Sequence, residues 1–148
     1  MNPKFILMPI TCFFVVISCA ILISSPKKTL IYQGIIGAFS WFIYLCFEKN
    51  IILANFLASI FIALSSHTMA RYSKVPVTVY FIPIFMPFVP GMSLYKSVFY
   101  LINADISMTN FYFFRALEIA GIIALAIFVS EPIVKVFFIL KNKIKKTN

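Results

Sequence analysis

The sequence contains little charge, and most of it is positive. Charged residues make up 11% of the 148 positions, against about a quarter in soluble domains, and four residues are acidic. A soluble domain would be left with too few charged groups for its surface. With four acids and one histidine the chain also offers no nucleophile–base spacing, so we expect it not to be an enzyme.

Cysteine is also scarce. Cys12, Cys19 and Cys46 all lie inside apolar runs, and no CxxC or Cys/His spacing links them. This pattern supports neither a metal site nor a disulfide framework. We interpret the three cysteines as small buried hydrophobes and predict no cofactor.

Apolar side chains are abundant instead. Hydrophobic residues make up 62% of the chain, 18 residues are Phe, and the mean hydropathy is +1.01. A disordered chain would be poor in such residues, so we predict an all-α integral membrane protein. A spanning helix needs roughly 20 apolar residues. On this basis the sequence predicts about five spans, at 5–25, 29–47, 51–70, 75–103 and 111–138, followed by a basic tail at 139–148. Because 5–25 is longer than a usual signal-peptide core, we predict that it is retained.

The basic residues indicate topology rather than nucleic-acid binding. The net charge is +9, but the lysines and arginines lie in short clusters between the apolar runs. Five spans would put most of them on one side, with Arg71 and Lys74 as topology determinants: Lys27, Lys28, Arg71, Lys74, Lys141, Lys143, Lys145 and Lys146. The positive-inside rule then predicts an external N-terminus and a cytoplasmic C-terminus.

The fourth predicted span contains an unusual group of prolines. As one helix, residues 75–103 would measure about 43 Å, more than the roughly 30 Å of a bilayer core. Pro83, Pro87 and Pro90 are spaced i, i+4, i+7, and Gly91 follows them. Each proline removes a helical hydrogen bond, which would free the carbonyl four residues earlier. We therefore predict a broken fourth helix, as one span or a re-entrant pair.

The broken helix is our candidate substrate site. A helix that restarts after Gly91 would present free N–H groups and a partial positive charge near mid-membrane, where an anionic group such as a carboxylate could bind. The alternative is that the prolines only shape packing. The candidate residues are Pro83, Pro87, Pro90, Gly91, Ser93, Tyr95 and Lys96.

Two motifs in this region resemble the threonine/serine exporter family. They are Ala70-Arg71-x-x-Lys74-x-Pro76 and Pro87-Phe88-Val89-Pro90-Gly91-x-x-x-Tyr95, within a similarity over about residues 28–136. The chain is most similar to the small five-span subunit that corresponds to the C-terminal half of full-length exporters. The resemblance implies proton-driven efflux of small amino acids, or short organic acids such as succinate, across the bacterial cytoplasmic membrane. It also implies a larger membrane subunit as partner, or a second copy of the chain.

Few ionisable side chains remain within the predicted spans. Arg115 and Glu118 are i, i+3 and can pair, while Glu131 has Lys135 at i+4. Both glutamates could reach an interface, or Glu118 could carry a proton. His67 is either an interfacial residue or a coupling group. A different class of function, a structural or holin-like pore-forming protein, would not need the aligned prolines.

Overall fold

The computed structural model describes the backbone of residues 4–147 and the side chains of residues 4–136. The described chain is built from helices: α1 (Lys4–Leu22), η1 (Lys27–Thr29), α2 (Leu30–Cys46), α3 (Ile51–Ser73), α4 (Thr78–Phe85), η2 (Met86–Phe88), α5 (Gly91–Ile102) and α6 (Ile106–Thr147). Four helices are long and apolar enough to span a membrane. The bent pair formed by α4–η2 and α5 is a fifth candidate if its two halves count as one span. The predicted all-α membrane protein with a broken fourth helix is therefore confirmed.

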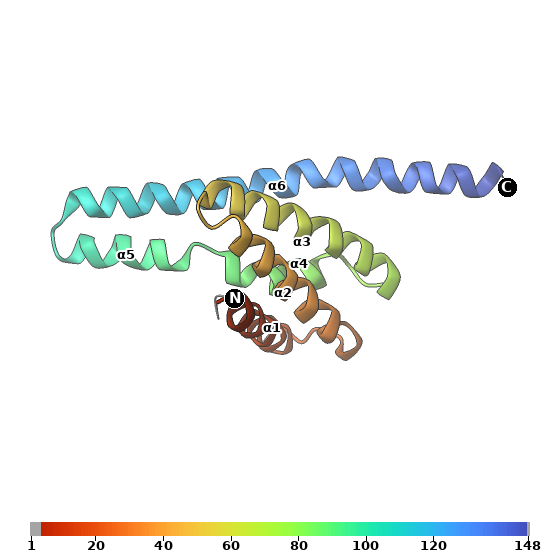
Figure 1. Cartoon of the computed structure of the whole chain (residues 1–148), viewed down its shortest axis with the longest axis horizontal. Helices are drawn as coiled ribbons and strands as arrows, with labels where there is room; N and C mark the ends of the chain where they lie inside the picture. Colours follow the sequence, from red (N-terminus) through yellow and green to blue (C-terminus); the bar gives the residue numbers. More distant parts are fainter. Residues whose placement is uncertain (1–3, 148) are drawn as a thin grey trace.

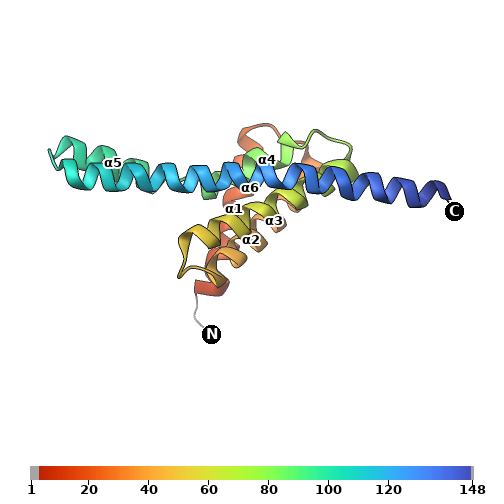
Figure 2. The same ribbon diagram turned by 90° about the horizontal axis from the view of Figure 1, so that it is seen from above.

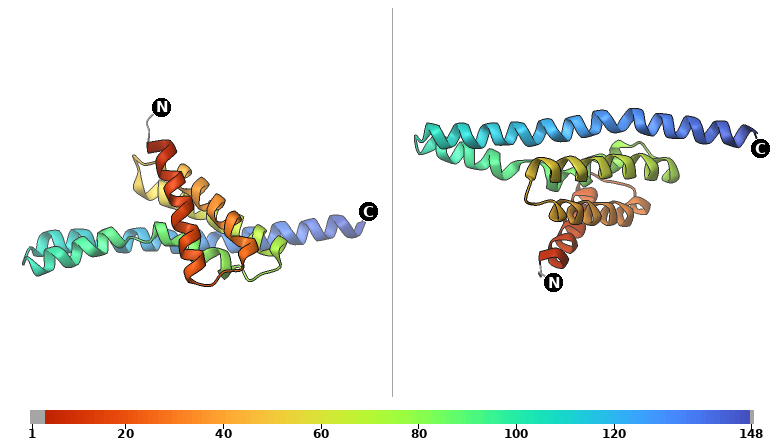
Figure 3. Two further views of the ribbon diagram at one scale, coloured as in Figure 1. Left: turned by 90° about the horizontal axis from the view of Figure 1, so that it is seen from below. Right: turned by 45° about the horizontal axis from the view of Figure 1, so that its top comes forward.

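The helices are layered in an order that differs from the order along the chain. α1 packs on α2, α2 on α3, and α3 on the long α6, while α5 returns alongside the first half of α6 (Figures 1 and 2). α4 lies between α1, α2 and α3. The α5–α6 hairpin extends away from the bundle formed by the other helices (Figure 3). The broken segment thus begins inside the bundle and ends outside it.

Helix α6 is longer than the predicted span at 111–138. It starts at Ile106 because Asp105 caps it, with the Met108 N–H donating to Asp105 Oδ1 at 3.0 Å. Its 42 residues correspond to about 63 Å, so it cannot lie wholly within a bilayer core of about 30 Å. The predicted basic tail continues this helix to Thr147, but its side chains, and residue 148, lie outside the described residues.

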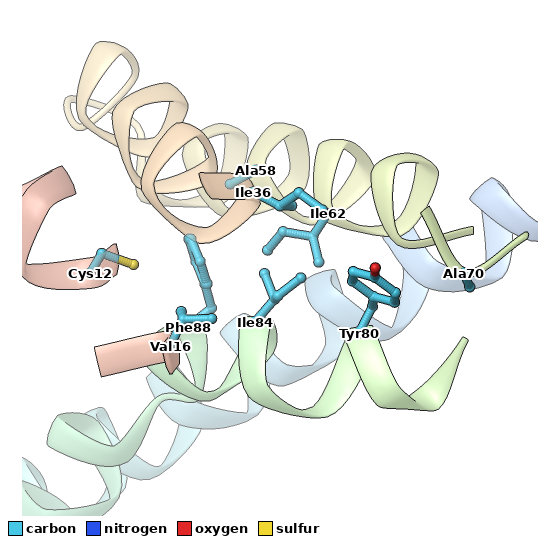
Figure 4. Close-up of a cluster of buried hydrophobic side chains, with 9 residues drawn as sticks. All are labelled: Cys12, Val16, Ile36, Ala58, Ile62, Ala70, Tyr80, Ile84 and Phe88. Carbon is cyan, nitrogen blue, oxygen red and sulfur yellow. The ribbon is translucent and has the colours of Figure 1, made fainter. Parts of the chain in front are cut away.

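A small apolar core holds α4 in place. Figure 4 shows Tyr80, Ile84 and Phe88, which extend from α4 and η2 toward side chains of α1, α2 and α3. Burial of these large side chains fixes the rotation of α4. The full cluster consists of Cys12, Val16, Ile36, Ala58, Ile62, Ala70, Tyr80, Ile84 and Phe88.

The motif Ala-Arg-x-x-Lys-x-Pro ends helix α3. Lys74 adopts the left-handed conformation with φ 54°, and the N–H of Val75 donates to the Ala70 carbonyl at 3.0 Å. This is a Schellman-type C-cap, in which a lysine occupies the position that glycine usually takes. Pro76 then prevents the helix from continuing. The motif therefore determines where the chain turns toward α4.

Gly34 and Gly37 permit close packing of α1 against α2. A Cβ on Gly34 would lie 2.7 Å from Phe13 Cε2, and one on Gly37 would lie 2.6 Å from Val16 Cγ2. Gly121 in α6 has no atom within 4 Å of such a Cβ. The two glycines of α2 are thus required because a side chain at either position would overlap α1. Gly121 has room for a side chain.

We predict that Gly37→Ala destabilises the protein by about 1–3 kcal/mol, because the added methyl overlaps Val16. Thermal unfolding in detergent micelles would measure this loss. Gly121→Ala is the matched control and should unfold at the wild-type temperature or slightly above it. Equal behaviour of the two variants would contradict the close α1–α2 contact.

Candidate functional site

The break in the fourth helix is a short turn between two helices. α4 ends at Phe85, η2 follows, Val89 is extended with φ −59° and ψ 134°, and α5 starts at Gly91 at an angle of 48° to the first half. Pro83 lies inside α4, Pro87 inside η2, and Pro90 just before α5. Since no single helix runs through them, the three prolines do not form the continuous face that their spacing suggests.

Two of the carbonyls freed by proline have found other donors. Val79 O, which loses its helical donor to Pro83, accepts from the Gln33 side-chain Nε2 of α2 at 3.0 Å. Met86 O accepts from the Val89 N–H at 3.3 Å within the turn. Both bonds satisfy backbone oxygens that would otherwise be unpaired in apolar surroundings.

Gln33 is the residue of this region that sequence reasoning missed. Its side chain is fully buried, and the same Nε2 also donates to Thr29 Oγ1 at 3.1 Å. Gln33 Oε1 is buried without a partner among the described residues. The signal that could have identified it is an amide in the middle of the apolar run 29–47.

A small cavity lies against the break, and we refer to it as the break cavity. Its volume is about 150 Å³. A second hollow, of about 200 Å³, lies on the α1 side and shares Trp41 and Pro87 with it. The break cavity is lined by Trp41, Tyr44, Asn55, Pro87, Phe88, Val89, Pro90, Met92, Ser93 and Ile119.

Residues with neutral hydrogen-bond donors line the break cavity. Trp41 Nε1 is buried and has no partner among the described residues. The first helical bond of α5 runs from the Leu94 N–H to the Pro90 carbonyl at 3.1 Å, so the amides of Met92 and Ser93 precede the helical ladder. Asn55 on α3 is buried, with its Nδ2 donating to Ile51 O at 2.8 Å. These donors, with the positive end of the α5 dipole, favour an anionic or strongly polar ligand group.

Several predicted site residues lie away from this cavity. Of the seven candidates, Pro87, Pro90 and Ser93 line it. Pro83 is buried in α4, and a Cβ on Gly91 would meet no atom within 4 Å. Gly91 is therefore required neither by space nor, since its φ is not positive, by backbone conformation.

Tyr95 and Lys96 contact other residues of the α5–α6 hairpin instead. Tyr95 is exposed and stacks on Phe99, with ring centroids 6.3 Å apart. Lys96 Nζ lies 5.0 Å from the centroid of the Tyr112 ring, a cation–π contact with α6. A lysine one turn into α5 was expected to face the substrate, but the packing of α5 on α6 directs it to the ring.

The ionisable residues of α6 are arranged partly as predicted. Arg115 and Glu118 form the predicted ion pair, with Arg115 Nη1 and Glu118 Oε2 3.0 Å apart. Glu131 and Lys135 form no ion pair in the described part of the chain, which differs from the expected i, i+4 contact. No group of three or more His, Cys, Asp or Glu side chains suited to a metal is present among the described residues.

An interrupted helix beside a cavity, in an all-helical membrane protein, is a feature that many secondary transporters share. The sequence profile of the threonine/serine exporter (ThrE) family matches residues 9–133, and the chain belongs to this family. The predicted family is thereby confirmed, and it is a family of transporters and not of enzymes. No curated protein and no solved structure matches the chain.

We predict that Gln33→Leu lowers the free energy of unfolding by about 1–3 kcal/mol, because it leaves the Val79 carbonyl buried without a donor. Unfolding by heat in detergent micelles measures the change. Ser40→Ala is the control, since the equally buried Ser40 hydroxyl bonds only Ile36 O in its own helix. The role of Gln33 would be refuted if its variant were no less stable than Ser40→Ala.

Proposed function

We propose that the chain is a subunit of a secondary exporter for small amino acids of the threonine/serine type or short organic acids such as succinate. The observation that carries this proposal is the break cavity at the interrupted helix. Its lining includes Trp41, whose buried N–H has no partner among the described residues, and the first residues of α5, whose amides precede the helical ladder. These donors suit a substrate carboxylate. Family membership supports the threonine/serine part of the proposal.

We place the protein in the bacterial cytoplasmic membrane with its C-terminus in the cytoplasm. The structure brings basic residues of different loops to one end of the bundle, where Lys28 Nζ donates to Ser73 O at 3.0 Å, next to the Lys74 cap. A basic end of this kind is retained on the cytoplasmic side under the positive-inside rule. The α1–α2 and α3–α4 turns would then face inward, and the N-terminus outward.

We further propose that a partner completes the transport path. Transporter sites lie between two halves or repeats, and a single chain with up to five spans supplies one such half. The start of α5 is also exposed, since the exposed fraction is 68% for Met92 and 66% for Tyr95. A larger exporter subunit, or a second copy of this chain, would cover this side of the break cavity. Proton-driven efflux follows the family resemblance.

The holin-like interpretation gains no support from these contacts. A simple pore has no use for a buried amide that pairs a freed backbone carbonyl, or for donors gathered at one small cavity. A solute-specific exporter has a use for both. Transport of defined solutes therefore separates the two interpretations directly.

We expect Trp41→Phe to impair transport by removing the N–H while preserving an aromatic ring at the cavity. A hydrogen bond to a charged group contributes about 1.5–3 kcal/mol, so KM should rise about ten- to hundredfold. Efflux of labelled serine, threonine and succinate from a deletion strain carrying the exporter measures this. The exposed Tyr32→Phe, also on α2, is the matched control.

Two outcomes would overturn the proposal. If none of the three solutes is exported above the deletion background, the assigned substrate class is wrong. If Trp41→Phe and Tyr32→Phe transport equally well, the break cavity is not the binding site.

A further inference from the structure

A groove lies between α2 and α3, and we refer to it as the α2–α3 groove. Its volume is about 470 Å³, and it is lined by Tyr32, Ile35 and Ile36 of α2 and by five α3 side chains, from Phe61 to Met69. Among these five, Thr68 has its hydroxyl bonded to Leu64 O of its own helix at 2.9 Å. His67 turns to α4 instead, with its ring centroid 5.4 Å from that of Phe81. The groove is therefore mainly apolar and suits a hydrocarbon chain.

One end of the groove lies next to the basic end of the bundle. Lys28 Nζ donates to Ser73 O at 3.0 Å, which brings the start of α2 together with the end of α3. Tyr32 follows Lys28 by four residues, and Met69 precedes Ser73 by four. Because residues four apart in a helix lie one above the other, the groove begins about one helical turn from this contact.

Four exposed cations gather at this end. They are Lys27, Lys28, Arg71 and Lys74. The two segments that carry them, 23–33 and 68–80, contain no acidic residue. Lys28 uses one of its three N–H donors on Ser73 and keeps two for an anion. A basic pocket between membrane helices on the cytoplasmic side is the kind of site that binds an anionic lipid head group.

Two tyrosines mark the level of the membrane surface here. Tyr72 is 76% exposed and follows Thr68 by four residues, so it continues the groove face of α3 toward the cations. Tyr32, also exposed, lies at the same level on α2. Tyrosine is enriched where hydrocarbon meets head groups. From Met69 to Phe61 the groove extends about 12 Å along α3, close to the roughly 15 Å depth of one leaflet.

We propose that the α2–α3 groove and its basic end bind an anionic phospholipid of the cytoplasmic leaflet. The head-group phosphate lies beside Lys28 and the cations around it, and one acyl chain lies along the groove. The choice of leaflet follows from the proposed orientation. Binding itself requires neither that orientation nor transport, because it uses no residue of the break cavity.

Quenching of indole fluorescence by brominated lipids tests this site. The reporter is Tyr32→Trp in a Trp41→Phe background, so that the indole in the groove is the only one in the full-length chain. The protein is placed in phosphatidylcholine nanodiscs with an equal share of brominated phosphatidylglycerol or brominated phosphatidylcholine. Phosphatidylglycerol should quench the groove indole more strongly. Phe39→Trp in the same background is the control for position, because Phe39 is exposed elsewhere on α2, and both lipids should quench it equally.

Charge variants identify the head-group contact. Lys28→Gln should lower the preference of the groove indole for phosphatidylglycerol about fivefold, the effect of one cation near a membrane surface. Lys27→Gln should lower it as well while keeping the Lys28–Ser73 bond, and it decides the question if Lys28→Gln fails to fold. Lys49→Gln is the matched control, since it removes the same charge from the turn at the other end of α2 and α3.

A groove variant tests the acyl chain. Ser65→Phe keeps every charge but fills the groove, so the preference for phosphatidylglycerol should fall to that of the Phe39→Trp reporter. An undiminished preference in Ser65→Phe would overturn the acyl-chain site.

Three results would overturn the lipid site as a whole. The first is equal quenching of the groove indole by the two lipids, and the second is an equal loss of preference in Lys49→Gln and Lys28→Gln. The third is a groove indole that neither lipid quenches, which would indicate a second copy of the chain in the groove.

Discussion

The hydrogen bond between Gln33 Nε2 and the Val79 carbonyl is the interaction on which the rest of this structure depends. Pro83 deprives that carbonyl of its helical donor, and a buried backbone oxygen left without a donor costs about 1–3 kcal/mol. α2 supplies the missing donor from a fully buried amide. Together with the packing of Tyr80, Ile84 and Phe88, this bond holds α4 within the bundle and allows the chain to turn at η2 (Figure 4).

Once α4 is held in this way, the break presents neutral donors to the cavity. The cationic side chains nearby are already engaged, since Lys96 lies over Tyr112 and Arg115 pairs with Glu118. The lining residues therefore offer neutral donors, among them the backbone amides at the start of α5, the Trp41 N–H and the Asn55 side chain. Neutral donors can bind a carboxylate without holding it as tightly as a buried ion pair would, which suits a transporter that must release its substrate.

The sequence was informative where the controlling interactions are local. Hydropathy predicted the helices, the prolines predicted the break, and i, i+3 spacing predicted the Arg115–Glu118 pair. Contacts between helices were not predictable, because they depend on how each helix is rotated against its neighbours. For that reason Gln33, Trp41 and Asn55 were missed, and Lys96 was expected at the cavity.

We propose that interrupted backbone, and not a charged side chain, recognises the substrate. NMR of the ¹⁵N-labelled protein in nanodiscs during titration with threonine tests it most directly. The account predicts saturable shifts of the Met92 and Ser93 amide signals and of the Trp41 indole signal, with the Gly121 amide unchanged. Saturable shifts confined to residues away from the break, such as the Lys96 side chain with Tyr112, would contradict it.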